Sequence, residues 1–178
     1  MRQLKINLSD LEDAFDSDGE MLSYYLDTET GEIILITEEI RGAWESISES
    51  YYDEETQTID WEKAFEAEQT PDWMREGVQA AEQVEAGFGS RIIAIPAQDS
   101  HEGYRDMEDF NATVGSPRLQ ERLERAISGR GAFRNFKNVL LDHPAERERW
   151  FKFKDEQVQQ RMLDWLEAQG IEPIPDET

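Results

Sequence analysis

The stretch Gly129-Arg130-Gly131-Ala132-Phe133-Arg134-Asn135-Phe136-Lys137 joins two amphipathic patterns and gathers basic and aromatic residues at one corner of the chain. The preceding pattern starts at Ser116 and Pro117, a favoured N-cap and first-turn pair, and predicts a helix of about three turns. The following pattern predicts a second helix over 132–141. Gly129 is expected to end the first helix in the left-handed conformation, so that the two short helices pack against each other.

Each of these two segments carries three cations at i, i+4, i+7 spacing. One interpretation is a site for an anion: a phosphate, a nucleic-acid backbone or an acidic partner segment. The alternative is that these cations pair with the chain's own carboxylates, since the sequence holds 41 Asp and Glu residues. The two rows are Arg118, Arg122 and Arg125, and Arg130, Arg134 and Lys137.

A third helix is predicted from about 144 to 169, with Gly170 as its stop. Trp150 and Phe153 lie on one flank of it, and Trp is enriched at binding hot spots. The alternative is a long helix buried along two faces. The same flank holds two basic residues, Lys154 and Arg161.

Composition narrows the class of protein. The 178 residues include no Cys, which rules out disulfides, a thiolate nucleophile and a Cys-based zinc site. No apolar run approaches the ~18 residues that a membrane span needs. The first residues lack the apolar core of a signal peptide, so we expect a cytoplasmic protein.

The charge is distributed unevenly. Residues 1–100 hold 25 acidic and 6 basic residues, a net −19 of the total −23, whereas residues 118–161 hold 11 basic and 7 acidic residues, a net +4. Such an acidic chain repels nucleic acid overall and favours basic partners. Mimicry of nucleic acid by carboxylates is a further interpretation, and plain solubility explains the same charge.

Local patterns in the first half predict a short strand at 5–8 and a helix capped by Ser9. A β-hairpin follows over 21–36 with Thr28–Gly31 as its turn. No metal site is predicted, because the Asp-rich turn at 16–20 lacks oxygen ligands at both ends of a calcium loop.

After the hairpin, Thr37 is expected to cap a helix. In the acidic tract 49–69, residues 60–65 are expected to form one or two helical turns and the rest a mobile loop. Thr70 and Pro71 then predict the start of a helix to about residue 86. Residues 91–96 predict an inner strand.

A further helix begins in the pattern Asp99–Glu102, which resembles a capping box. Glu102, Asp106 and Asp109 share one face of this helix, and they are expected to meet the arginine rows of the following helices. The apolar face of the helix is formed by Tyr104, Met107, Phe110 and Val114.

The fold class that follows is α+β: a small antiparallel sheet of about three or four strands, built from the early strands and the strand at 91–95, with a helical C-terminal half. Residues 1–100 form an acidic α+β part. Residues 101–171 form a helical part packed on it in a single domain, and residues 172–178 form a loose tail.

The residues of this C-terminal half resemble a known group. The segments Ser100–Phe110, Gly129–Lys137 and Trp150–Phe153, together with the hairpin around Tyr25–Glu32, look like uncharacterised protein family (UPF) 0158. The most specific part is the run GRGAFRNFK with the aromatic segment downstream. The resemblance implies a small acidic bacterial protein and carries across no catalytic residue.

For function, the chain is poorly equipped as an enzyme: it has two His, no Cys, and no P-loop, nucleophile elbow or zinc spacing. We therefore hypothesise a non-enzymatic binding or regulatory protein that acts through protein–protein contacts and uses no cofactor. The alternative is a nucleic-acid-binding module that uses the cations of 118–137. A further alternative is a carboxylate- or metal-dependent hydrolase. The candidate binding residues are Arg118, Arg122, Arg125, Arg130, Arg134, Lys137, Trp150 and Phe153.

Overall fold

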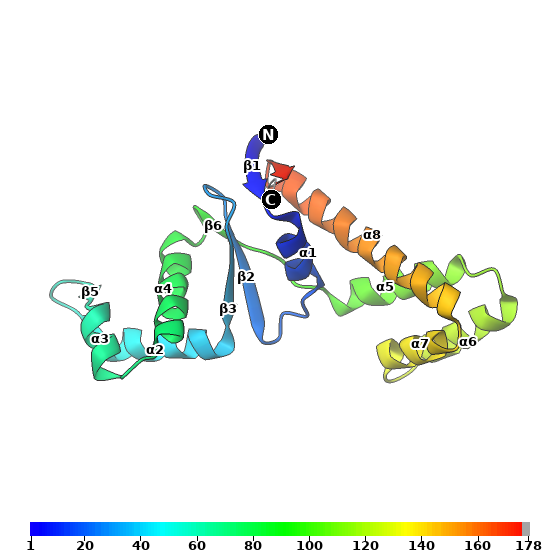
Figure 1. The fold of residues 1–178 in the computed structure, drawn as a ribbon, viewed down its shortest axis with the longest axis horizontal. Helices are drawn as coiled ribbons and strands as arrows, with labels where there is room; N and C mark the ends of the chain where they lie inside the picture. Colours follow the sequence, from blue (N-terminus) through cyan, green and yellow to red (C-terminus); the bar gives the residue numbers. More distant parts are fainter. Residues whose placement is uncertain (176–178) are drawn as a thin grey trace. The chain divides into compact units, whose positions relative to one another are not determined.

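The computed structural model of the chain describes residues 1–175 and divides into two compact units (Figure 1). The sheet unit comprises residues 2–97 and 172–175, and the helical unit comprises residues 98–171 together with Met1. The architecture is α+β with a helical C-terminal half, as predicted. Along residues 1–175, no helix combines the length and apolar character needed to cross a membrane.

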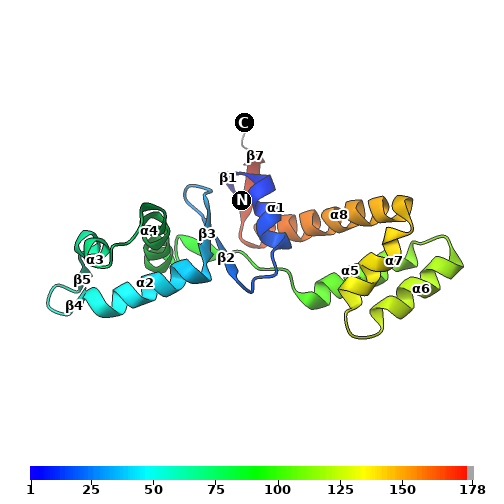
Figure 2. The same cartoon turned by 60° about the horizontal axis from the view of Figure 1, so that its bottom comes forward.

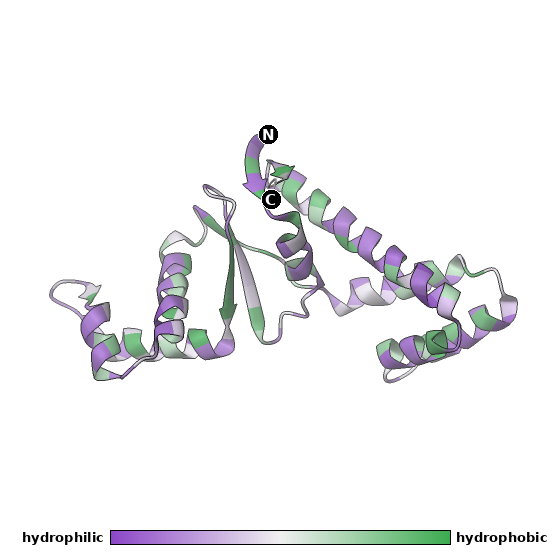
Figure 3. Ribbon diagram, viewed as in Figure 1, coloured by the Kyte–Doolittle hydropathy of each residue, from purple (hydrophilic) through white to green (hydrophobic). Residues whose placement is uncertain are grey.

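The sheet unit is built on an antiparallel three-stranded sheet. Its central strand is β2 (Leu22–Asp27), with β3 (Ile33–Thr37) on one side and β6 (Ile92–Ala94) on the other. The hairpin prediction is confirmed. The prediction that the third strand is an inner one is wrong, because β6 is an edge strand. Figure 3 shows β3 as a continuously apolar strand, as its sequence Ile-Ile-Leu-Ile requires.

Two helices cover this sheet. The helix α2 (Glu38–Tyr51) is capped by Thr37, whose hydroxyl accepts a hydrogen bond from the Ile40 amide, and α4 (Asp72–Gly87) packs against it. Burial of apolar side chains from all these elements forms one core, made of Tyr25, Ile34, Ile36, Ile40, Ala81, Val84 and Ile92. The cap predicted at Thr70 is wrong, since Pro71 is the N-cap residue of α4 and makes no side-chain bond.

The acidic tract holds more regular structure than predicted, and the helical turns expected over 60–65 are confirmed. α2 extends to Tyr51, a small hairpin of β4 (Tyr52–Asp53) and β5 (Thr58–Ile59) follows, and α3 (Trp61–Ala67) comes next. Few apolar side chains were available to predict this. They suffice because Ala64 and Phe65 are buried in a second core together with Ile47 of α2 and Val78 of α4.

The N-terminal elements begin earlier than predicted. The strand β1 is Arg2–Ile6, and the helix α1 (Leu8–Asp16) is capped by Asn7 rather than by Ser9. The Asn7 Oδ1 atom accepts hydrogen bonds from the Ser9 and Asp10 amides at 3.0 and 3.2 Å. Asn is as good an N-cap as Ser, so the sequence offered two starts and the first was used.

The chain after the last helix is a strand over its described part. β7 (Ile171–Pro175) pairs with β1 in a two-stranded sheet, so the expected loose tail is wrong for residues 172–175. Two observations explain the pairing: Ile171 is buried, and the Gln3 amide donates to the Glu172 carboxylate at 3.3 Å. Residues 176–178 of the expected tail lie outside the described residues. β1 therefore pairs here rather than in the three-stranded sheet.

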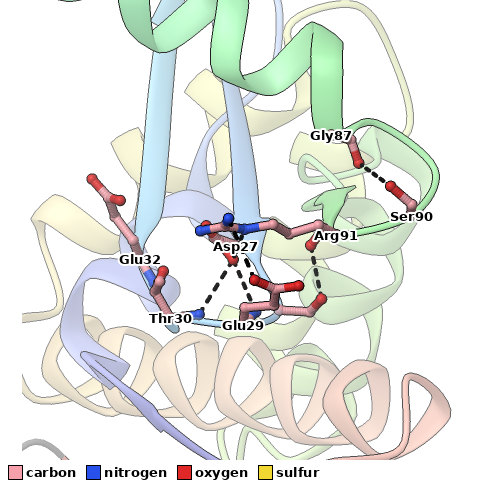
Figure 4. Close-up of polar contacts among 8 residues, drawn as sticks. Asp27, Glu29, Thr30, Glu32, Gly87, Ser90 and Arg91 are labelled. Atoms are coloured by element: carbon pink, nitrogen blue, oxygen red, sulfur yellow. Dashed lines mark hydrogen bonds and ion pairs between the residues drawn. The ribbon is translucent and has the colours of Figure 1, made fainter.

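A polar cluster closes the β2–β3 hairpin (Figure 4). Asp27 is fully buried, and its carboxylate accepts from the Arg91 Nε at 2.9 Å and Nη2 at 2.6 Å, and from the backbone amides of Glu29 and Thr30. The Arg91 guanidinium is the main cause that lowers the pKa of Asp27 to about 2, and the two amides contribute further. This ion pair links the hairpin turn to the segment before β6.

The helical unit consists of four helices in sequence (Figure 2): α5 (Ser100–Ala112), α6 (Pro117–Ile127), α7 (Ala132–Leu141) and α8 (Pro144–Ala168). α6 and α7 lie side by side, as predicted. Figure 3 shows α8 alternating between apolar and hydrophilic turns. The shared core is made of Met107, Phe110, Val114, Leu119, Leu123, Ile127, Phe136, Leu140 and Trp150.

The corner between α6 and α7 follows the sequence with one difference. Ser116 caps α6 with its hydroxyl and Pro117 begins it, as predicted. Gly131, rather than Gly129, is the left-handed residue, with φ +71° as the N-cap of α7. α6 ends instead at Ser128, whose hydroxyl donates to the Glu124 and Arg125 carbonyls and satisfies the helix end.

Candidate functional site

A pocket of about 160 Å³ lies in the helical unit, between α5, α7 and α8. α7 supplies Phe133, Phe136 and Lys137, which belong to the run that anchored the sequence interpretation. We call this feature the aromatic pocket. Its lining residues are Gln98, Gly103, Asp106, Met107, Phe133, Phe136, Lys137, Trp150, Phe151 and Lys154.

The lining residues differ in depth. Met107, Phe136 and Trp150 are buried in the core, whereas Phe133 and Phe151 remain 44% and 41% exposed. The Phe136 and Trp150 rings meet edge to face with centroids 4.9 Å apart. The pocket thus has rigid aromatic walls and two further aromatic side chains that still offer apolar surface to a ligand.

A glycine makes room for one of the exposed rings. Gly103 is buried on α5, and a Cβ atom there would lie 3.0 Å from the Phe133 Cε1 atom and 3.3 Å from its Cζ atom. Those distances are tighter than an ordinary van der Waals contact. The bare backbone at this position therefore lets the Phe133 ring lie directly against α5.

The carboxylate in the pocket is already neutralised by a pairing partner. Asp106 is 5% exposed, and both of its oxygens accept from the Arg161 guanidinium at 3.0 Å. Arg161 also lies 3.8 Å from a Glu102 oxygen. The prediction that Glu102 and Asp106 meet the arginine rows of α6 and α7 is wrong, because their partner comes from α8.

Cations of α7 line or flank the pocket. Lys137 is part of its wall, and Arg134 is its neighbour one helical turn away at i, i−3. Within residues 1–175, the side chains of Arg130, Arg134 and Lys137 make no ion pair or hydrogen bond, and all three are exposed. The self-pairing interpretation therefore does not describe this row.

The α6 row is arranged differently. Arg125 pairs with Glu121 at 2.6 Å within its own helix, and an Arg122 nitrogen lies 3.4 Å from the His143 ring. Arg118 is exposed and makes no side-chain bond within residues 1–175. None of the three lines the aromatic pocket, so the structure does not join the two rows in one pocket.

The two aromatic candidates of α8 belong to the core side of the pocket. Trp150 is 6% exposed and Phe153 is partly buried against the same core cluster, so the interpretation as a buried helix face describes them better than an open surface does. Trp150 still contributes to the pocket wall, whereas Phe153 does not line it.

Sequence reasoning did not select the residues that give the pocket its opening. Phe133, Phe151 and Gly103 are not among the candidate binding residues predicted from the sequence. Phe133 and Phe136 at i, i+3 indicate an aromatic helix face, but this pattern does not distinguish the opening of a pocket from a packed core. Proximity of α7 to Gly103 and Phe151 is a tertiary fact that no local pattern shows.

Two further features bear on the chemistry of the site. Arg147 lies over the Phe151 ring, 5.2 Å from its centroid, which adds a cation beside this pocket residue. Among the described residues 1–175, no group of three or more His, Asp or Glu side chains is arranged to hold a metal ion.

Comparison with known proteins gives a family and one curated relative. The sequence model of the uncharacterised protein family UPF0158 matches residues 76–178, a segment that includes the whole aromatic pocket. A UPF0158 protein of Pseudomonas aeruginosa is 24% identical over 173 residues, which cover 97% of this chain and 88% of that protein. No solved structure matches the chain.

Proposed function

The chain belongs to the uncharacterised protein family UPF0158, and from its geometry we propose that it is a non-enzymatic binding protein that docks a partner protein at the aromatic pocket. The proposed setting is the cytoplasm of a bacterium, in keeping with the bacterial relative. The observation that carries the proposal is the combination of two exposed Phe side chains with unpaired α7 cations at one pocket.

The exposed Phe side chains lack apolar cover, and the α7 cations lack carboxylate partners within residues 1–175 of their own chain. Exposed aromatic side chains that keep half of their surface in water gain about 1–2 kcal/mol each when a partner covers them. Lys137 and Arg134 have no carboxylate of their own chain, so a partner's carboxylates would make new charge-assisted hydrogen bonds. Aromatic and Arg side chains are the groups that most often dominate the energy of protein interfaces.

Nucleic acid is the competing partner class, and it is favoured only by the unpaired cations themselves. A nucleic acid would extend its phosphates beyond the local cations of α7 along a chain of net charge −23, which repels them, whereas a short acidic protein segment stays beside those cations. The pocket is also small, with buried walls, and presents no row of open rings on which successive bases stack. A protein segment fits this combination better.

The test compares charge reversal on α7 with the same reversal on α6. Tagged full-length protein is used to capture partners from its own bacterium, with nuclease and at 50 and 300 mM NaCl. Arg134→Glu with Lys137→Glu is expected to abolish capture, and Arg118→Glu with Arg122→Glu, which changes the net charge equally, is expected to leave it intact. Capture that is lost on nuclease treatment, or equal in both variants, would contradict the proposal.

A further inference from the structure

We propose that the aromatic pocket takes a single apolar side chain of Phe or Leu size from an acidic segment of the partner. This inference rests on the proposed function and names the chemistry of the segment. It is carried by three properties of the pocket, namely its volume, the depth of its lining residues and the sign of its charges.

The volume sets the size of the anchor. A cavity of about 150 Å³ with apolar walls is large enough for benzene, and the aromatic pocket measures about 160 Å³. A Phe ring or a Leu side chain would therefore fill it, and an indole would require its walls to move. Close-packed walls resist such movement, because Met107, Phe136 and Trp150 are part of the core of the unit.

The two exposed rings would also contact the anchor side chain. Phe133 is held against the bare backbone of Gly103, and Phe151 has Arg147 on its face. Because they stand at the water-exposed side, an inserted side chain would cover apolar surface on both of them. The binding energy is thus concentrated in one residue of the partner, which is the usual pattern at hot spots.

The cations around the pocket favour acidic residues on either side of the partner's anchor residue. Lys137 lines the pocket, and Arg147 and Arg134 lie next to its lining residues. The Asp106 carboxylate is bound by Arg161 on both oxygens, so its charge is largely compensated. Carboxylates that flank the anchor would meet cations, whereas a basic segment would meet like charges and be rejected.

The test uses blocked pentapeptides and the full chain. The reference peptide is Asp-Asp-Phe-Asp-Asp, and the others carry Leu, Ala or Trp at the centre, or Lys at the four flanking positions. Isothermal titration gives affinities, and backbone amide NMR shifts report the site. The Phe and Leu peptides are expected to bind with shifts at residues 133–137 and 151–154, and the Ala and Trp peptides at least ten-fold more weakly. The Lys-flanked peptide is expected not to bind.

Two variants locate the contact. Phe133→Ala removes an exposed ring and leaves the core residues in place, so the fold should survive, and it is expected to weaken the reference peptide at least five-fold. Lys137→Gln is expected to weaken it and to reduce its salt dependence, and Arg118→Gln on α6 is the matched control with no effect.

The outcomes separate this inference from the proposed function. Equal binding of the Ala and Phe peptides overturns the anchor, and equal binding of the Lys-flanked peptide overturns the charge selection. If no peptide binds while charge reversal on α7 still abolishes partner capture, the proposed function stands and this inference is wrong. If that capture also survives the reversal, both are wrong.

Discussion

At the scale of single residues, the buried carboxylates carry more of the stability than the many exposed ones. Asp27 is fully buried and is held by Arg91 and two backbone amides, whereas most carboxylates of the chain are exposed. Exposed ion pairs contribute about 0–1 kcal/mol each, because water already solvates both charges. A buried carboxylate contributes through its partners, so its loss is specific and measurable.

The Asp27 site predicts an acid-dependent loss of stability. Its pKa is lowered to about 2 in the folded state, from about 3.9 in an unfolded chain, so the ionised form stabilises the fold above pH ~4. This contribution, about 2 kcal/mol, is lost as the pH falls toward 2. Asp27→Asn should therefore lower the free energy of unfolding by about this amount at pH 7 and by roughly half as much at pH 3. Urea unfolding of the wild-type chain and the variant at both pH values measures the loss of unfolding free energy. A loss that is the same at pH 7 and pH 3 would refute the argument.

The pocket carboxylate supplies a second prediction with an internal control. Arg161→Gln leaves Asp106 buried without its cation and should lower the free energy of unfolding by about 3 kcal/mol. Arg125→Gln breaks an ion pair that is shorter, at 2.6 Å, but whose two side chains are both exposed. It should change the free energy of unfolding by less than about 0.5 kcal/mol. Equal effects of the two substitutions in urea unfolding would mean that burial of Asp106 is not what matters.

At the scale of elements, the corner between α6 and α7 positions Phe133 and Lys137 for the pocket. Gly131 adopts φ +71° just before α7, a conformation that costs a non-glycine residue roughly 1–2 kcal/mol. Gly131→Ala should lower the free energy of unfolding by about this amount and weaken binding of the reference peptide. Gly129 is not left-handed and has open space where a Cβ would lie, so Gly129→Ala should be neutral or slightly stabilising. Thermal unfolding of the two variants checks this, and a larger effect at Gly129 would contradict the structure.

The elements that were predicted well from the sequence are those that short-range patterns determine, namely apolar periodicity and N-cap residues. The period of apolar residues predicted α5, α6 and α7, and the caps at Thr37, Asp99 and Ser116 are confirmed. The errors lie where two local choices compete or where the partner is distant. Ser9 and Asn7 are equivalent caps, and β7 pairs with a strand at the opposite end of the sequence.

At the scale of the whole molecule, only the basic residues of the candidate site could be predicted from the sequence. The α7 cations were found from their spacing, and their lack of internal partners was not, because that depends on where 41 carboxylates end up in space. The apolar component was invisible for a related reason. Phe133, Phe151 and Gly103 come from three helices, and nothing in their local patterns distinguishes an opening from a packed core.

The charge of the chain leads to a last prediction about its stability. With a net −19 in residues 1–100 at pH 7, folding brings like charges together, and their repulsion opposes the compact state. Salt reduces this repulsion: raising NaCl from 20 to 300 mM shortens the screening length from about 20 to about 6 Å. The free energy of unfolding at pH 7 should therefore rise with salt, on the order of 1 kcal/mol over this range.

The matched control for this effect is the same salt step near pH 4.3, the isoelectric point of the sequence. Net repulsion is small there, so salt should change the free energy of unfolding little. The Asp27–Arg91 pair is still ionised at this pH, and it is screened weakly because its carboxylate is buried. Lowering the pH from 7 toward 5 should thus stabilise the chain through reduced repulsion, and a further fall below 4 should destabilise it through Asp27. A chain that salt destabilises at pH 7 would instead be held together by exposed ion pairs, contrary to the small value expected of them.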